Sequence, residues 1–436
     1  VASRGLGDVY KRQGRSSRTK RSDASRTAAA LSGTEPENAM AILAVNAGSS
    51  SLKFSLHPLS GVEVQVPVLT GNIEGLEPGG SPQMRWRSVS DSHSRALASS
   101  GSDAFGTALQ SLRQLLTDDA RYARPQAVSH RVVHGGTHFS ASVKVDDAVL
   151  TELEKLNSLA PLHQPHNIAG IRAFAAAFPD VPQIACFDTA YHASAPALHQ
   201  SFALPAALTT QGVRRYGFHG LSYQYIIGAL QEHSARASGR VLMAHLGNGA
   251  SLCAARAGKS IASTMGFSAL DGLMMGTRSG TLDPGVLMYL MEQGWDHRGI
   301  ERLLYKESGL LGVSGVSADM RTLRSNGSEA AQAAIDLFTH RIVRESGAML
   351  ACLQGLDVVA FSGGIGEHDA VLREQVCMAL DWLGVKLDKN KNHAATGDTI
   401  LPVHADDSKI EIWVIPTDEG RVAAREAALL MRGDRT

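Results

Sequence analysis

The chain has 436 residues, too many for a single hydrophobic core, so we expect two domains. Its 42 basic and 42 acidic residues cancel, and without an overall basic field a nucleic-acid partner is not expected. No apolar run approaches the roughly 20 residues of a membrane-spanning helix, so no membrane partner is expected either. The cysteines Cys186, Cys253, Cys352 and Cys377 form no CxxC pair and have apolar neighbours. They predict buried free thiols and a cytoplasmic protein.

Residues 1–39 differ in composition from the rest of the chain. They are rich in Arg, Lys and Ser and show little apolar periodicity. One interpretation is a transit peptide. We favour another, in which Gly5 to Gln13 is a translated sequencing adaptor and Met40, directly before the first predicted strand, is the natural start. Under both interpretations we leave residues 1–39 out of the fold and expect them to be disordered.

From Met40 onward, strand-like and helix-like segments alternate, which predicts an α/β fold. Residues 41–56 read as a strand, a small polar turn and a second strand, and residues 126–136 as a strand that ends in glycines. Helical patterns follow at 146–160 and 167–179, and residues 183–192 read as a buried strand with a polar end.

The second half continues the same alternation. Residues 240–258 predict a strand, a glycine-rich turn and a strand. A helix is expected within 282–294, with Asp283 as its N-cap, and a long amphipathic helix within 328–350. The latter carries Ile335, Phe338, Ile342 and Met349 on one face. Residues 356–376 predict strand, glycine turn and helix, and residues 411–432 predict a last strand and a last helix.

Two segments 200 residues apart resemble each other. Residues 44–54, AVNAGSSSLKF, and residues 244–254, AHLGNGASLCA, share Ala, Ser and Leu at matching positions. Each lies in a strand, small-residue turn, strand setting. This predicts a duplicated domain with one such turn in each half.

Turns of small residues can cradle phosphate oxygens, because backbone N–H groups and hydroxyls are exposed there. The turn from Asn46 to Lys53 adds a Lys charge, although a plain hairpin turn with a solvated Lys explains it equally well. Glycine-rich turns also end the strands at His245–Gly249 and Gly364–His368. Together they predict a nucleotide held between two domains, because open α/β folds bind ligands beyond the carboxyl ends of strands.

Four charged residues lie at positions that suggest a binding or catalytic role. Arg131 lies within an apolar strand, so we expect it to meet an anion, either a protein carboxylate or a substrate carboxylate. Arg278 stands in a loop between glycines and Asp188 ends a buried strand. Glu419 begins the last predicted helix, where an acidic residue is also favourable without any function.

Ten motifs occur in the order expected of the acetate kinase family. They are VNAGSSSLK, HRVVHGG, APLHQPHN, FDTAYH, RYGFHG, HLGNG, MGTRSGTLDP, SGVSADMR, SGGIGE and IPTDE. The resemblance runs from Met40 almost to the C-terminus. It implies two duplicated actin-like, ribonuclease-H-like α/β domains flanking a nucleotide cleft. The implied domains are 40–188 and 189–420, with a C-terminal helix at 421–436 that completes the first.

The resemblance implies reversible, direct transfer of the γ-phosphoryl group of ATP to acetate, giving acetyl phosphate and ADP. Arg131 and His163 would contact the acyl substrate, and Val133, Leu162 and Phe218 would line its pocket. Asp188, His219 and Arg278 would be catalytic, with His219 and Arg278 stabilising the phosphoryl group. The family usually forms homodimers, and we expect one here.

The resemblance also implies the sites for nucleotide and metal. Asn46 and Glu419 would hold Mg²⁺, with Mn²⁺ as an alternative. The nucleotide phosphates and adenosine would contact Ser49, Ser51, Lys53, His245, Leu246, Gly247, Asn248, Gly249, Asp319, Met320, Arg321, Gly364, Ile365, Gly366, Glu367 and His368.

Four positions depart from the family pattern. Ala262, Thr137 and Ala269 stand where Asp, Glu and Pro are usual, and Met320 replaces a common Phe, which leaves the nucleotide preference open. Ala269 could enlarge the acyl pocket, so propionate is an alternative substrate.

Two other functions remain open. The GGIG turn, with Asp388 farther on, resembles a dinucleotide fingerprint and suggests an NAD-dependent oxidoreductase, although the third glycine is missing. A non-catalytic nucleotide-binding switch of the same superfamily is disfavoured by the presence of both arginines.

Overall fold

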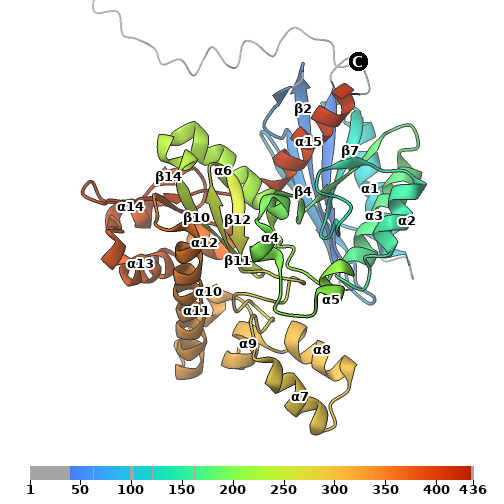
Figure 1. Cartoon of the computed structure of the whole chain (residues 1–436). Helices are drawn as coiled ribbons and strands as arrows, with labels where there is room; N and C mark the ends of the chain where they lie inside the picture. Colours follow the sequence, from blue (N-terminus) through green and yellow to red (C-terminus); the bar gives the residue numbers. More distant parts are fainter. Residues whose placement is uncertain (1–39, 62, 99–102, 120, 162, 434–436) are drawn as a thin grey trace, which may run out of the picture.

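A computed structural model of the chain describes residues 40–433 except 62, 99–102, 120 and 162 (Figure 1). The predictions for residues 1–39 and for Leu162 therefore lie outside the described residues. Two β-sheets with helices packed around them form two lobes (Figure 1). The α/β fold class with two related sheets, expected from the alternation and from the family resemblance, is confirmed.

The first sheet has nine strands in the order β6-β5-β4-β2-β1-β7-β9-β8, with β3 paired to β2. Its strands are β1 (Ala41–Ala47), β2 (Ser51–Ser60), β3 (Glu63–Val64), β4 (Leu69–Glu74), β5 (Gln83–Ser88), β6 (Ser92–Ala96), β7 (Pro125–Val132), β8 (Val143–Lys144) and β9 (Gln183–Phe187). The second sheet has six strands in the order β12-β11-β10-β13-β15-β14. These are β10 (Arg240–Leu246), β11 (Ala250–Arg256), β12 (Lys259–Ser263), β13 (Val358–Ser362), β14 (Leu401–Pro402) and β15 (Glu411–Val414).

The two sheets share the same central arrangement. Strand β1 pairs antiparallel with β2 and parallel with β7, and β10 pairs antiparallel with β11 and parallel with β13. The segments that resemble each other in sequence form the two hairpins, in which Ala44 pairs with Ser55 and Ala244 pairs with Leu252. The hairpin turns therefore occupy equivalent positions in the two sheets.

Helices cover both sheets (Figure 1). The α-helices are α1 (Ala104–Asp118), α2 (Asp147–Glu154), α3 (Gln164–Ala177), α4 (Ala197–Gln200), α5 (Ala206–Thr210), α6 (Gly220–His233), α7 (Pro284–Glu292), α8 (His297–Lys306), α9 (Gly309–Ser314), α10 (Met320–Asn326), α11 (Glu329–Leu353), α12 (Gly363–His368), α13 (Ala370–Ala379), α14 (Lys389–Ala394) and α15 (Glu419–Gly433). Short 3₁₀ helices span Ala190–Ser194, Ala235–Ser238 and Asp381–Leu383.

Helix boundaries differ from the sequence expectation at α2 and α3, and α3 begins at Gln164 and not at residue 167. Helix α2 ends at Glu154, and the chain continues in turns that close from Leu156 to Leu153 and from Asn157 to Glu154. Pro161 follows shortly, and a proline disfavours helix in the residues before it. The last helix begins at Glu419, as the sequence pattern predicts, because Asp418 caps it by accepting the backbone N–H of Arg421 at 2.9 Å.

The C-terminal helix α15 returns to the first sheet, where it lies alongside the strands at the start of the chain (Figure 1). Val422, Ala423 and Ala427 are buried in one cluster with Ile42 and Ala44 of β1. Small residues on this face allow close approach of the helix to the sheet. The start of α15 is thereby held between the two sheets.

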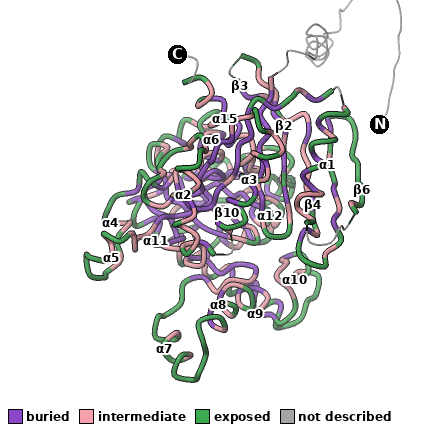
Figure 2. The backbone as a smooth tube through the Cα atoms, turned by 90° about the vertical axis from the view of Figure 1, so that its right-hand side faces the viewer, coloured by how far each residue is buried: buried purple, intermediate pink, exposed green. Residues whose placement is uncertain are grey.

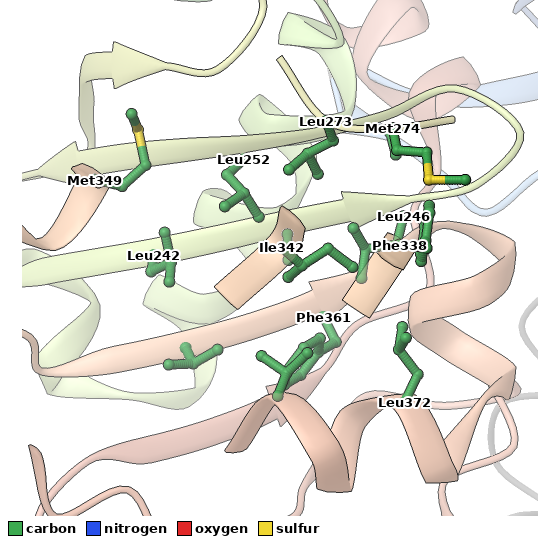
Figure 3. Packing of buried hydrophobic residues seen from close by; sticks show 14 of the residues in the cluster. Leu242, Leu246, Leu252, Leu273, Met274, Phe338, Ile342, Met349, Phe361 and Leu372 are labelled. Atoms are coloured by element: carbon green, nitrogen blue, oxygen red, sulfur yellow. The ribbon is translucent and has the colours of Figure 1, made fainter. Parts of the chain in front are cut away.

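The core of the second lobe is built on α11. Phe338, Ile342 and Met349 are buried against Leu242 and Leu252 of the sheet (Figure 3). The helix face predicted from the apolar spacing is confirmed. Cys352 on the same helix is exposed, so the prediction of a buried thiol is wrong there, since the residue falls on the outward face. Cys186, Cys253 and Cys377 are buried and free as predicted.

Helix α7 differs from the other long helices in having no buried residue. It lies at the far end of the second lobe (Figure 1), and its residues are exposed or of intermediate burial (Figure 2). Met288, Tyr289 and Met291 are 64, 59 and 58% exposed. In the described part of the chain, no helix is long and apolar enough to cross a membrane.

Arg373 of α13 is fully buried in the second lobe. Its guanidinium donates to the side chain of Asn392 at 2.7 Å and to the backbone oxygens of Gly366 (2.9 Å), Glu367 (2.7 Å), Asn392 (2.7 Å) and Ala395 (3.0 Å). Burial lowers the pKa of Arg373 to about 10, so it stays charged at neutral pH. It ties the end of α12 to α14.

We expect Arg373→Met to lower the free energy of unfolding by about 3–5 kcal/mol, because it leaves several buried carbonyls without a donor. Urea denaturation followed by circular dichroism measures the loss. The exposed Arg302, which pairs with Glu307 on the surface, supplies the matched Arg→Met control and should change stability by less than about 0.5 kcal/mol. Equal effects of the two substitutions would contradict the assigned role of Arg373.

Candidate active site

A cavity of about 550 Å³ lies between the two sheets, within the size range of small-molecule sites. Its walls come from β1, β2 and β7 of the first sheet, from the turn after β10, from α12, and from the start of α15. Predicted site residues that line it are Asn46, Lys53, Arg131, Val133, His163, Asp188, Phe218, His219, His245, Gly247, Asn248, Gly249, Arg278, Gly364, Glu367 and Glu419. The fold thus brings together residues that lie far apart in the sequence.

Other predicted site residues do not line this cavity. They are Ser49, Ser51, Leu246, Asp319, Met320, Arg321, Ile365, Gly366 and His368. Leu246 and Met320 belong to the hydrophobic core. Arg321 is 88% exposed and pairs at 2.7 Å with Asp319, which caps α10. The side chains of these four residues are therefore engaged in packing or in local contacts.

The segment Gly364–His368 was predicted to be a glycine-rich turn. This prediction is wrong, because the segment is part of helix α12. Ser362 at the end of β13 is the N-cap residue. The backbone N–H of Gly363 donates to Glu367 at 2.8 Å, so the helix closes on its own first turn. The same carboxylate accepts the backbone N–H of Thr417 at 3.1 Å. Glu367 therefore links α12 to the segment that leads into α15.

Arg131 extends from β7 into the cavity and is paired with protein carboxylates. Its Nε donates to both oxygens of Asp188 at 3.1 Å, and its Nη2 donates to Asp188 at 2.6 Å. Glu419 lies 3.4 Å from Nε. Of the two partners considered for Arg131, the protein carboxylate is therefore present. Nη1 has no hydrogen bond among the described residues and remains available for a ligand.

The pKa values of the two carboxylates beside Arg131 are shifted in opposite directions. Burial raises the pKa of Asp188 to about 6, although Arg131 opposes the rise. Burial also acts to raise the pKa of Glu419, but the positive charge of Arg131, followed by His245 and Lys53, holds it below its usual value. Glu419 is thus an ionised carboxylate in the cavity wall.

Arg278 reaches the cavity from the loop after β12. One of its nitrogens donates to the backbone oxygen of Ala269 at 2.9 Å and contacts the sulfur of Met275 at 3.6 Å. In the described part of the chain, no carboxylate lies within ion-pair distance of it. Burial lowers its pKa, which reflects the unfavourable environment of an uncompensated cation. Such a site favours a bound anion.

His219 stands at the start of α6 in a left-handed conformation, with φ of 58°. This conformation is strained for a residue with a side chain and is typical of functional sites. Its ring packs on that of His245 at a centroid distance of 4.3 Å. A Cβ at Gly249 would lie 3.2 Å from Nε2 of His219 and 3.9 Å from Arg278. Gly249 therefore leaves open the space that these two side chains share.

A small apolar surface adjoins the arginines. Val133 and Phe218 are buried and line the cavity with Ala269. The backbone N–H of Val133 donates to the side chain of Asn167 at 3.0 Å, which ties the end of β7 to α3. His163 at the start of α3 also lines the cavity. Burial, assisted by Arg278 and Arg131, lowers the pKa of His163 to about 4, so it is neutral at pH 7.

The chemistry of Asn46 and Glu419 suits a hard cation. Both line the cavity, and the Asn46 amide has no hydrogen bond among the described residues. One carboxylate and one amide oxygen, completed by phosphates and water, is a common donor set for Mg²⁺. Lys53 stands opposite Asn46 in the β1–β2 pair and adds a positive charge beside them.

Several cavity residues were missed by the sequence analysis. They are Ala44, Val45, Phe54, Ser55, Gly363, Thr417, Asp418, Gly420 and Ala423. The signal for Thr417 and Asp418 was present, because they precede Glu419 in the motif IPTDE. The alternation of side chains along β1 and β2 could have indicated Ala44 and Ser55, which share a face with Asn46 and Lys53.

A cleft between two related α/β lobes, with two arginines, a lysine and neutral histidines around a small apolar surface, is the arrangement of a phosphotransferase that acts on a small anionic acceptor. Comparison with known proteins agrees. Residues 41–425 match the acetokinase family. The chain belongs to that family, and it is therefore a phosphotransferase with a carboxylate acceptor.

Individual relatives cover nearly the whole chain. An acetate kinase of Rhodopseudomonas palustris is 47% identical over 409 residues, which is 90% of this chain and 99% of the relative. The solved acetate kinase of Porphyromonas gingivalis is 34% identical, with a TM-score of 0.80 over 90% of this chain and all (100%) of the other. A propionate kinase from Francisella tularensis is also 34% identical, with a TM-score of 0.82 over 89% and 98% of the two chains.

Membership in this family overturns the alternative of an NAD-dependent oxidoreductase. The structure removes its basis as well. Asp388 does not end a strand but caps helix α14, accepting the backbone N–H groups of Asn390 and Lys391. An acidic residue that holds a ribose hydroxyl is expected at the end of the next strand of the sheet.

Proposed function

We propose that the protein transfers the γ-phosphoryl group of ATP to acetate, reversibly and in one direct step, giving acetyl phosphate and ADP. The main support for this proposal is the environment of Arg278. This residue is a largely buried cation without a carboxylate partner among the described residues, and it faces the same cavity as Arg131 and the apolar surface. Direct transfer of this kind requires mainly positioning and charge compensation.

Arg131 would hold the acetate carboxylate. Its Nε and Nη2 are engaged by Asp188, which leaves Nη1 for the substrate. Asp188 thus orients the guanidinium, so a hydrogen bond from Arg131 costs little further ordering. Val133 and Phe218 would enclose the methyl group, with Ala269 at the edge.

Arg278 and His219 would stabilise the phosphoryl group during transfer. Charge builds on the oxygens of this group in the transition state, and donors already in place lower its energy. The space left by Gly249 lies next to both side chains. A phosphoryl group there would meet two donors from the second lobe.

The nucleotide phosphates would lie against Lys53 of the first lobe and the His245–Gly249 turn of the second, with Gly364 and Glu367 toward the adenosine end. Asn46 and Glu419 would hold Mg²⁺, with Mn²⁺ as an alternative. The ion would supply positive charge to the phosphates when bound. Because these groups come from both sheets, they would bring donor and acceptor together in the cleft.

Propionate is the second candidate acceptor, because Ala269 leaves room beside the pocket. We expect acetate to be preferred and propionate to be used less well. Trapping acyl phosphates as hydroxamates, with ATP and Mg²⁺ and with acetate, propionate or butyrate, measures the preference. Formation of no acyl phosphate from any of the three would overturn the proposed function.

We also propose the division into domains 40–188 and 189–420, with the helix at the C-terminus completing the first. The exposed apolar side chains Met288, Tyr289 and Met291 of α7 support a homodimer, because such a surface is unfavourable in water. A cytoplasmic location agrees with the three buried free thiols. Light scattering during gel filtration tests the dimer.

A further inference from the structure

His219 is connected to two buried hydroxyl groups behind it. Its Nδ1 lies 2.9 Å from Oγ of Ser251, and the same Oγ lies 2.5 Å from the hydroxyl of Tyr223. His219 is 8% exposed, and Ser251 and Tyr223 are both fully buried at 0%. The three groups form a chain of hydrogen bonds, and its two hydroxyl-bearing residues are shielded from water. The assigned role of His219 uses Nε2 and leaves this chain unexplained.

The direction of the chain follows from the Tyr223 hydroxyl. Burial raises the pKa of Tyr223 well above its usual value, so the phenol keeps its hydrogen. Among the described residues, Ser251 Oγ is the acceptor within reach of that hydrogen. If Ser251 donated to Tyr223 instead, the phenol hydrogen would be buried without an acceptor, which is unfavourable. Tyr223 therefore donates to Ser251. The hydrogen of Ser251, which is fully buried, then has Nδ1 of His219 as its acceptor among the described residues, so Ser251 donates to Nδ1.

This direction decides where His219 carries its hydrogen. Burial, with nearby His245, Arg131 and Arg278, lowers the pKa of His219 well below 6.5, so the ring is neutral. A neutral imidazole has one N–H group and one acceptor nitrogen. Since Nδ1 accepts from Ser251, Nε2 carries the hydrogen. Nε2 is the nitrogen that faces the space beside Gly249.

The ring of His245 also contacts a serine hydroxyl, but there the direction of the hydrogen bond is not fixed. Ser222 Oγ lies 2.8 Å from Nδ1 of His245 and 2.9 Å from the hydroxyl of Thr417. Thr417 lines the cavity, so its hydrogen can point either to Ser222 or into the cavity. The direction at His245 is therefore free. Ser222, next to Tyr223 on α6, supplies a matched control.

We propose that Tyr223 and Ser251 are positioning residues, which hold His219 in the form with hydrogen on Nε2 and so present an N–H donor to the transferring phosphoryl group. The proposal rests on the proposed function. We call the hydrogen bonds from Tyr223 through Ser251 to His219 the relay. Without the relay the ring can also carry its hydrogen on Nδ1. It would then direct the lone pair of Nε2 at an anionic oxygen, which replaces an attraction by a repulsion.

The expected kinetic effect is on turnover. Tyr223→Phe keeps the ring and removes the hydroxyl, so we expect kcat to fall about 10- to 100-fold, with KM for ATP and for acetate changed less than about 2-fold. Ser251→Ala should act in the same direction and is the second variant if Tyr223→Phe does not fold. Ser251→Thr keeps the hydroxyl and should restore most of the turnover.

The direct test is the tautomer of His219, read from ¹⁵N–¹H correlations of ¹⁵N-histidine-labelled protein at pH 8. His219→Asn assigns the signal. We expect hydrogen on Nε2 in the wild type and in Ser222→Ala, and a mixture or the Nδ1 form in Tyr223→Phe and Ser251→Ala. An unchanged tautomer in both relay variants would overturn the proposal, as would unchanged kcat. Wild-type protein with the Nε2 tautomer that makes no acyl phosphate would overturn the proposed function instead.

Discussion

Arg278→Ala should lower kcat by on the order of 10³-fold while the protein remains folded. Arg278 compensates charge on the transferring group, and removing one such preorganised donor commonly costs 10²- to 10³-fold, or more where the donor is an arginine. Because the native Arg278 is a buried cation without a carboxylate partner among the described residues, its loss should not reduce stability. Steady-state kinetics with ATP and acetate, together with thermal unfolding, measure both quantities.

Two controls sharpen this prediction. Arg278→Lys keeps the charge but not the planar group, and should recover part of the turnover. Arg302→Ala removes an arginine that is 66% exposed on α8 and should leave kcat unchanged. If Arg278→Ala lowered kcat less than about 5-fold, Arg278 would not be the residue that compensates the phosphoryl charge.

The second large effect is expected at Arg131. Arg131→Ala should lower kcat/KM for acetate by about 10²- to 10³-fold and change KM for ATP little, because Arg131 would bind the carboxylate alone. It should also lower stability by about 3–5 kcal/mol, since Asp188 and Glu419 lose their shared counter-charge. Initial rates with acetate varied at saturating ATP, and urea denaturation, give the two values.

The double variant Arg131→Ala/Asp188→Ala separates the two effects. Removing Asp188 as well relieves a buried negative charge, so part of the lost stability should return. The defect with acetate should remain, because the donor to the substrate is still missing. Recovery of acetate use in the double variant would contradict the assignment of Arg131 to the substrate.

Much of the fold could be predicted from the sequence. The alternation of strand and helix patterns indicated an α/β protein, and the two similar hairpin segments indicated two related halves. The Gly364–His368 segment was predicted wrongly as a turn, because glycine favours turns locally. The side chain of Glu367 receives the N–H of Gly363 and helps to close a helix there, which a local pattern does not reveal.

The site was predictable where motifs carry the functional residue itself. Arg131, Asp188, His219, Arg278 and Glu419 all line the cavity. The contacts between them were not predictable, since the pairing of Arg131 with Asp188 depends on adjacent strands in the sheet.

Asp319 and Arg321 illustrate the opposite case. They stand in a family motif, but their side chains pair with each other at the start of α10 and do not line the cavity. The contact between Tyr223 and Ser251 could not be predicted from a local sequence pattern, because Tyr223 lies on α6 and Ser251 on β11.

The central claim is that this cleft passes a phosphoryl group from ATP directly to a short carboxylate. ³¹P NMR of the protein with ATP, Mg²⁺ and acetate tests it most directly. We predict signals of ADP and acetyl phosphate that grow in equal amounts, that need acetate, and that are nearly lost in Arg131→Ala and Arg278→Ala. Signals of ADP and inorganic phosphate that grow equally with and without acetate would contradict the claim.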